Sequence, residues 1–194
     1  GKIQALSQLA YSEFIENENH LSLLPTTTVY NIDDYDLIAE QSQLIQKTGN
    51  KFFFSHRSIM EYFIAVYFGA QKINIELLDY DISKNRDIIV FYHAIHSSVK
   101  QTEVYLKQHV EAITVLEQIF LEKDITDLDI ITQYFDKKME ALDSYVAQDY
   151  QQLGHFAVKY PVVAEKLNEV VLQRLYSSTD LAFINSALVC LMWF

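Results

Sequence analysis

Apolar residues recur at intervals of three and four positions along most of the chain, the spacing that places them on one face of an α-helix. Over residues 2–17 this stripe consists of Ile3, Leu6, Leu9, Ala10 and Phe14. Over residues 56–70 it consists of Ile59, Phe63, Val66 and Ala70. After Asn74 the periodicity predicts further helices at 84–98, 101–122, 126–150, 151–159, 161–177 and 179–193. We therefore expect a mainly α-helical protein.

One short stretch between these helices has a β-type pattern. Residues 42–46 and 51–54 contain β-prone side chains, and Gly49-Asn50 lies between the two runs. Glycine and asparagine both tolerate the positive φ that a tight hairpin turn requires. The sequence therefore predicts a small β-hairpin near residues 42–54.

The composition changes at about residue 72. Both β-prone runs and three of the four glycines precede this point, and the rest of the chain is nearly pure helix. A second, short helix is expected through about Gln41, with Asp33 or Asp34 as its cap. Helix, short helix, hairpin and helix is the element order of a winged-helix module with its wing before the last helix. We expect a winged-helix-like domain at 1–72 and a helical domain at 73–194, the latter a bundle or a short irregular α-solenoid.

Composition and charge exclude several classes of protein. Half of the residues are hydrophobic and 13% are aromatic, which excludes a disordered chain. The net charge of −11 argues against a nucleic-acid partner, because binding to phosphate backbones needs clustered lysine and arginine. The single cysteine, Cys190, cannot form an internal disulfide, and its apolar neighbours predict a buried thiol. These features favour a cytoplasmic protein without a membrane partner.

The two ends of the sequence also carry information. Gly1-Lys2 contains no initiator methionine and resembles a cleavage scar, so we expect a piece of a longer protein. The apolar stretch from Leu181 to Phe194 is shorter than the about 20 residues that span a bilayer. We expect it to pack as a last helix, with a partner lying outside this sequence as the alternative.

The most specific feature is the run GNKFFFSHRSIMEYFIAVYF at residues 49–68. It closely resembles a segment of NACHT-type STAND NTPases. There a wing strand leads into an aromatic–Ser–His–Arg/Leu–Ser/Thr–x–x–Glu–Tyr/Phe–Phe–x–Ala motif. The residues in register with that motif are Phe54, His56, Arg57, Ser58, Glu61, Tyr62, Phe63 and Ala65. A weaker resemblance extends over residues 2–98, although the tryptophan usual in the following helix is absent.

The resemblance implies a role within a larger protein. STAND proteins are ATP-driven switches with an upstream P-loop, and this sequence contains no G-x-x-x-x-G-K-[ST] motif. The chain is therefore expected to be no enzyme and to bind no cofactor of its own, while ATP or ADP and Mg²⁺ belong to the parent protein. The resemblance further implies that His56 senses the nucleotide state by facing the ADP phosphates, with Arg57 beside it. An imidazole N–H is a suitable donor to a phosphate oxygen.

The other motif residues are expected to be structural. Glu61 lies four positions after Arg57, a spacing that favours an ion pair on one helix. The alternative to nucleotide sensing by His56 is a structural role, either as a helix cap or as a hydrogen-bonding group inside a core.

These observations predict a non-catalytic regulatory and interaction module of a bacterial-type NACHT/STAND signalling NTPase. It would couple the nucleotide state of an upstream NTPase domain of the same chain to the sensing of a protein partner or ligand. A second reading is a HEPN-like ribonuclease, because Arg86 and His93 fit the loose R-x(4–6)-H spacing of those enzymes. A third is a purely structural helical scaffold. His93 and His96 lack a third ligand at helical spacing, so no metal site is expected.

Overall fold

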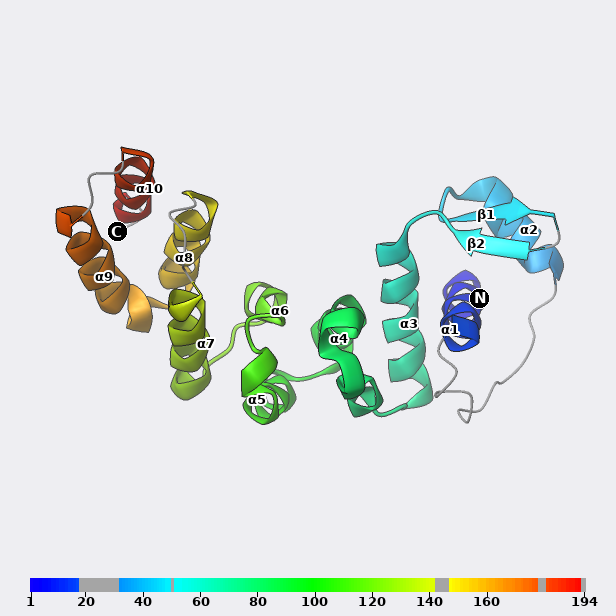
Figure 1. Cartoon of the computed structure of the whole chain (residues 1–194). Coiled ribbons are helices and arrows are strands. Elements are labelled where there is room, and N and C mark those ends of the chain that lie inside the picture. Colours follow the sequence, from blue (N-terminus) through cyan, green and yellow to red (C-terminus); the bar gives the residue numbers. More distant parts are fainter. Residues whose placement is uncertain (18–31, 50, 142–146, 178–180, 193–194) are drawn as a thin grey trace. The chain divides into compact units, whose positions relative to one another are not determined.

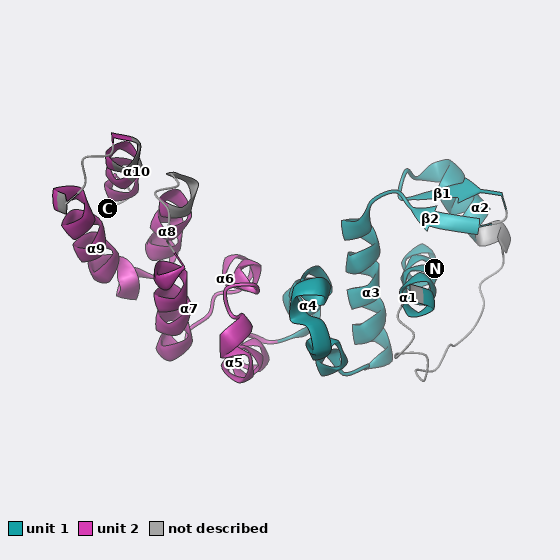
Figure 2. Ribbon diagram, viewed as in Figure 1, with its two compact units in different colours: residues 1–97 teal, residues 98–194 magenta. Residues whose placement is uncertain are grey.

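The computed structural model describes residues 1–17, 32–49, 51–141, 147–177 and 181–192 (Figure 1). Over these ranges the chain is mainly α-helical with one small antiparallel hairpin, as the sequence predicts. It divides into two compact units, Gly1–Ser97 and Ser98–Phe194 (Figure 2). The unit boundary thus lies 25 residues beyond the change of composition near residue 72, because α4 packs on α3 and joins the first unit.

The first unit is built around one central helix. Its elements are α1 (Lys2–Asn17), α2 (Ile32–Gln41), β1 (Ile45–Thr48), β2 (Lys51–Phe54), α3 (Arg57–Gln71), the 3₁₀ helix η2 (Ile75–Asp81) and α4 (Ile82–His96). Both α1 and α4 pack against α3. As a result α3 buries a wider face than the predicted stripe, with Ile64 and Phe68 fully buried and Ala70 exposed.

Aromatic rings fill the contact between α1 and α3. Tyr11 stacks on Tyr67 with ring centroids 4.1 Å apart, and Phe68 meets Tyr11 edge-on at 6.1 Å. Leu6, Ala10 and Phe14 of the predicted stripe are buried, whereas Ile3 in the first turn is 65% exposed.

Glycine permits a close approach between α3 and α4. A Cβ atom added to Gly69 would lie 2.3 Å from ring atoms of His96, so the imidazole rests directly on the glycine backbone. Partial burial of the imidazole lowers the pKa of His96.

The hairpin forms where the sequence predicts it. The register pairs Ile45 with Phe54 and Thr48 with Lys51, which leaves a two-residue connection. Gly49 adopts a φ of 63°, the left-handed conformation expected of this turn, while Asn50 lies outside the described residues. Ile45 is buried and Phe54 meets Phe63 at 5.9 Å, so the hairpin is attached to α3.

The described residues of the second unit form helices and their connecting segments, with no β-strand. Its elements are α5 (Val99–Gln108), η3 (Val110–Ala112), α6 (Glu117–Glu122), α7 (Leu128–Glu140), α8 (Ala147–Lys159), η4 (Pro161–Val163), α9 (Ala164–Ser177) and α10 (Leu181–Leu191). The single helix predicted at 101–122 is wrong, because the chain leaves α5 at His109 and resumes regular helix only at Glu117. The helix predicted at 126–150 corresponds to α7, which ends already at Glu140. The helix predicted at 151–159 corresponds to the later part of α8.

Four aromatic residues form the centre of the second unit. Phe120 lies 4.5 Å from Tyr134, Tyr134 lies 4.6 Å from Phe156, and Phe156 lies 4.7 Å from Tyr160 between ring centroids. All four are at most 6% exposed, and burial raises the pKa of Tyr160 to about 12. We call these residues the aromatic cluster. It joins α6, α7 and the end of α8.

The C-terminal end of α6 is held by two side chains at the end of α8. The Lys159 ammonium donates to the carbonyl oxygens of Phe120 (2.8 Å), Leu121 (3.0 Å) and Lys123 (3.0 Å). The Tyr160 hydroxyl donates to the carbonyl oxygens of Phe120 and Lys123. A cation at a helix C-terminus also complements the helix dipole. Lys159 therefore satisfies carbonyl groups that have no partner within α6.

Replacing Lys159 with methionine is expected to lower the free energy of unfolding by about 1–2 kcal/mol, because part-buried carbonyl oxygens lose a charged donor. The measurement is urea unfolding followed by far-UV circular dichroism. Lys166→Met is the matched control, because its ion pair with Asp136 lies at the surface and is worth about 0–1 kcal/mol. Equal losses in the two variants would contradict the capping role.

The buried thiol predicted for Cys190 is confirmed. Cys190 on α10 is fully buried, and burial raises the pKa of its thiol to about 11. No helix among the described residues is long and apolar enough to cross a membrane.

Candidate functional site at the start of helix α3

His56 occupies the N-cap position of α3 but does not cap it with its side chain. Its backbone is extended, with φ −141° and ψ 139°, and its imidazole makes no capping hydrogen bond. Its backbone carbonyl oxygen makes the contacts with the first turn of α3, accepting hydrogen bonds from the amides of Ile59 (3.1 Å) and Met60 (3.3 Å). The residue is exposed. The structure therefore favours neither a helix cap nor a core hydrogen bond as the role of this side chain.

Ser55 fixes the backbone that leads into His56. Its amide donates to the carbonyl oxygen of Leu44 (2.9 Å), and its hydroxyl donates to that of Gln43 (2.6 Å). These bonds extend the hairpin pairing beyond Phe54. The residue after β2 is thereby hydrogen-bonded to the two residues before β1. As a result, the start of α3 has a defined position relative to the hairpin.

An open cleft of about 740 Å³ lies beside His56. Its lining comes from α2, from β1 with the residues before it, and from Ser55 and His56: Asp36, Ala39, Glu40, Ser42, Gln43, Ile45, Gln46, Lys47, Ser55 and His56. The cleft is mixed in charge, and Lys47 is paired with Asp36 at 2.5 Å. Asp36 and Glu40 outnumber Lys47 in this lining, so the α2 side of the cleft is acidic.

Arg57 extends along α3 toward α4. Its Nε donates to Oε1 of Glu61 at 2.7 Å, which confirms the predicted pair at helical spacing. Its Nη2 donates to the carbonyl oxygen of Lys84 near the start of α4, at 3.3 Å. Arg57 therefore joins the N-terminal ends of two packed helices, a connection that spacing along one helix does not predict.

Glu61 is the buried ionisable group of this region, with 3% of the residue exposed. Burial raises the pKa of Glu61, the Arg57 guanidinium works in the opposite direction, and the carboxyl group of Asp87 on α4 adds to the rise. Asp87 is in turn bound by Arg86 at 2.7 Å. The result is a row of four charged groups, Arg57–Glu61–Asp87–Arg86, in which two neighbouring carboxyl groups lie between two guanidinium groups where α3 meets α4. We call it the charge chain.

The remaining motif residues build the framework of the site. Phe63 and Ala65 are buried in the contact surface of α3. Tyr62 is 40% exposed and lies edge-on to Phe63 and to Phe91 of α4. Ser58 is exposed in the first turn of α3. The motif thus presents His56, Arg57 and Ser58 at the surface and buries Phe63 and Ala65.

The structure does not bring Arg86 and His93 together as a catalytic pair. Arg86 lies at the surface in its ion pair with Asp87, whereas His93 is 3% exposed on the interior side of α4. RNA cleavage needs both side chains on the substrate, so this arrangement gives the ribonuclease reading no support. Among the described residues no group of three or more His, Cys, Asp or Glu side chains is placed to hold a metal ion.

Comparison of the chain with known protein families, with curated proteins and with solved structures found no match. The geometry around His56 and the resemblance of residues 49–68 are therefore the basis for a proposal about function.

Proposed function

We propose that this chain is a non-catalytic regulatory and interaction module of a NACHT/STAND signalling NTPase in the cytoplasm. In this proposal it follows an NTPase domain of the same protein and transmits that domain's nucleotide state to a helical arm that senses a protein partner. The observation that carries the proposal is the exposed, non-capping imidazole of His56 at the N-terminus of the 15-residue helix α3.

The start of α3 is chemically suited to a phosphate group. The N-terminus of an α-helix carries partial positive charge and unpaired amides, both of which favour an anion. An imidazole N–H adds a donor, and its strength increases when the ring is protonated. The acidic side of the neighbouring cleft disfavours an anion inside it. We therefore place the phosphate on His56 at the helix end rather than inside the cleft.

The charge chain supplies a physical connection from this point to the next helix. Arg57 adjoins His56 and reaches both Glu61 and the Lys84 carbonyl oxygen. A change in the position of the α3 N-terminus would alter these contacts with α4. Coupling of this kind needs two discrete arrangements of packed elements with different ligand affinities. In the proposal, the presence of the phosphate at His56 favours one of these two arrangements of α3 and α4, and its absence favours the other.

The test is ADP retention by the protein translated from the complete reading frame of this gene. We expect His56→Ala to weaken ADP binding by about tenfold, the equivalent of one charge-assisted hydrogen bond. ADP that remains bound after desalting is quantified by chromatography of the denatured protein. His155→Ala is the matched control, because it removes an exposed histidine from the second unit.

Two outcomes would contradict the proposal. One is a complete reading frame without a Walker A motif upstream of residue 1. The other is equal ADP retention by the wild type, His56→Ala and His155→Ala when the Walker A motif is present.

A further inference from the structure

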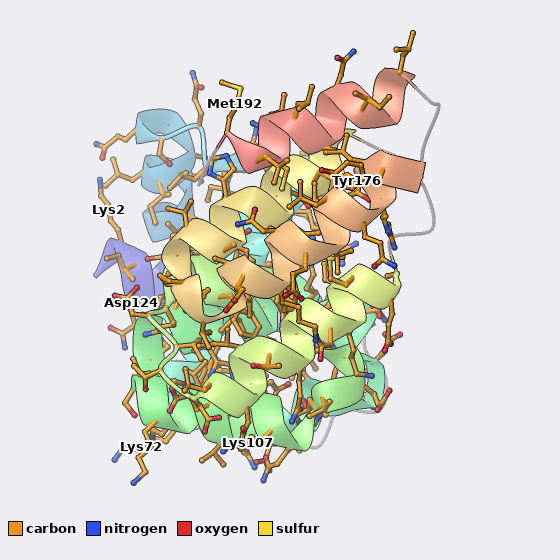
Figure 3. All side chains as sticks on the ribbon, turned by 90° about the vertical axis from the view of Figure 1, so that its left-hand side faces the viewer. Lys2, Lys72, Lys107, Asp124, Tyr176 and Met192 are labelled. Carbon is orange, nitrogen blue, oxygen red and sulfur yellow. The ribbon has the colours of Figure 1, made fainter. Side chains whose placement is uncertain are left out.

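Helix α10 exposes a continuous row of residues on the side that faces away from its own unit. Leu181 is 75% exposed, Leu188 is 50% exposed and Met192 is 84% exposed, and Asn185 is exposed between them. Met192 continues the helical turn, since its amide donates to the carbonyl oxygen of Leu188 at 3.1 Å. The opposite side contains the fully buried Ala187 and Cys190, and α10 packs against α8 and α9. Figure 3 shows α10 with Met192 near its end and Tyr176 on α9.

The spacing of this row is that of a coiled-coil seam. Leu181, Asn185, Leu188 and Met192 follow one another at intervals of four, three and four, which are the intervals between successive a and d positions of a heptad. A helix that is covered only from one side buries a single stripe and shows a polar outer face. Here the outer face is as apolar as a pairing interface, and the exposed Val189 adjoins it.

Charge distinguishes α10 from every other described α-helix. It contains no charged residue, whereas each of the others contains at least one. The chain carries a net charge of −11, so two copies repel each other over most of their surfaces. The uncharged face of α10 adds no local charge to this repulsion, so two copies meet there at the lowest electrostatic cost.

Asn185 determines how two such helices fit together. In an antiparallel pair centred on the row, Asn185 would lie against Leu188 of the second copy and would be desolvated without an amide partner. In a parallel pair the two Asn185 side chains face each other, and each amide donates to the other. A single asparagine at such a position is known to specify register and a two-helix state.

We propose that this face, which we call the α10 seam, is a self-association surface on which a second copy of the chain docks its own α10 in parallel. The seam is short and the area is small, so the dimer is weak and forms at high protein concentration. This inference is independent of nucleotide sensing by His56.

The first test is sedimentation velocity of the full chain over about 10 µM to 1 mM, the range in which weak association is populated. We expect a concentration-dependent monomer–dimer equilibrium, and we expect Leu188→Glu to weaken it at least tenfold by placing like charges opposite each other. Leu121→Glu is the control, because Leu121 is equally exposed, at 54%, but lies on α6. Circular dichroism of both variants checks that helix content is unchanged.

The second test determines orientation. Leu181→Cys should form an intermolecular disulfide under mild oxidation, because residue 181 faces its own copy only in a parallel pair. Native Cys190 is fully buried and is expected to stay reduced. A wild-type chain that remains monomeric at the highest concentration would overturn the proposal, as would a dimer insensitive to Leu188→Glu. A disulfide that forms only between Leu181→Cys and Met192→Cys chains would overturn the parallel arrangement.

Discussion

Replacement of Phe120 with alanine is expected to lower the free energy of unfolding of the second unit by about 3–5 kcal/mol. Phe120 is fully buried at the centre of the aromatic cluster. Its ring lies 4.5 Å from Tyr134, 5.8 Å from Phe156 and 6.3 Å from Tyr160, measured between centroids. Alanine removes the transfer free energy of the ring and leaves a cavity among Tyr134 of α7, Phe156 of α8 and Tyr160, which directly follows α8.

The cavity is expected to persist because its walls cannot close. Tyr134 is held by a hydrogen bond from its hydroxyl to Glu117 at 3.2 Å, and Tyr160 is held by its hydroxyl contacts with the carbonyl oxygens of α6. These polar anchors fix the rings around the missing one. A domain of this size has a total stability of about 5–15 kcal/mol, so the variant approaches the limit of folding.

Urea unfolding at neutral pH measures this loss, and hydrogen exchange assigns it to residues. We expect the amides of α6, α7 and α8 to lose protection. Leu121→Ala is the matched control: Leu121 adjoins Phe120 in sequence but is 54% exposed, so the change should stay within about 0.5 kcal/mol. Similar losses in the two variants would show that the aromatic cluster does not hold the second unit together.

The sequence predicts helix faces better than helix ends. For residues 101–122 the spacing predicts an apolar stripe of Val104, Val110, Ile113, Leu116 and Phe120. Ile113, Leu116 and Phe120 are fully buried, whereas Val104 is 51% exposed and Val110 is half-buried. However, the chain between His109 and Leu116 is not regular α-helix. Neither glycine nor proline marks that break. Tertiary packing therefore determines where the helix is interrupted, and periodicity alone does not report it.

At the candidate site, too, contacts between residues close in the sequence were predicted and contacts between distant residues were not. The Arg57–Glu61 pair follows from the i,i+4 rule, and the hairpin turn follows from the conformational freedom of Gly49. Asp87 and the Lys84 carbonyl were not predicted, because their contacts join residues more than 20 positions apart. The seven-residue spacing of Arg86 and His93 predicts one helix face for both side chains, but it does not predict how deeply each is buried. His93 is buried, whereas Arg86 is at the surface.

Removal of the Arg57 guanidinium is expected to destabilise the first unit by about 2–3 kcal/mol at pH 7, because it leaves a buried carboxylate without its donor. Glu61 is 3% exposed, so water cannot replace the lost hydrogen bond fully. The expected loss is smaller than for a fully buried ion pair because the Arg57 side chain itself is 70% exposed. The measurement is urea unfolding of Arg57→Met.

The loss in Arg57→Met is expected to shrink as the pH falls. Burial and Asp87 raise the pKa of Glu61, while Arg57 lowers it, so removing Arg57 raises that pKa further. A carboxyl group with a raised pKa binds its proton more tightly in the folded state. The associated stability is complete below the unfolded-state pKa of about 4.3 and is lost as the pH rises through the folded-state value. Arg57→Met should therefore lose more stability than the wild type between about pH 4.3 and 7.

A double-mutant cycle with Glu61→Gln separates this electrostatic role from packing. The glutamine oxygen still accepts from Arg57, and its amide is able to donate to Asp87, but it carries no charge. In the Glu61→Gln background we expect Arg57→Met to cost less than about 1 kcal/mol and to show no added pH dependence. If Arg57→Met costs the same in both backgrounds, neutralisation of Glu61 is not what Arg57 contributes. The connection between α3 and α4 would then depend on its bond to the Lys84 carbonyl oxygen and on the contacts of its aliphatic stem.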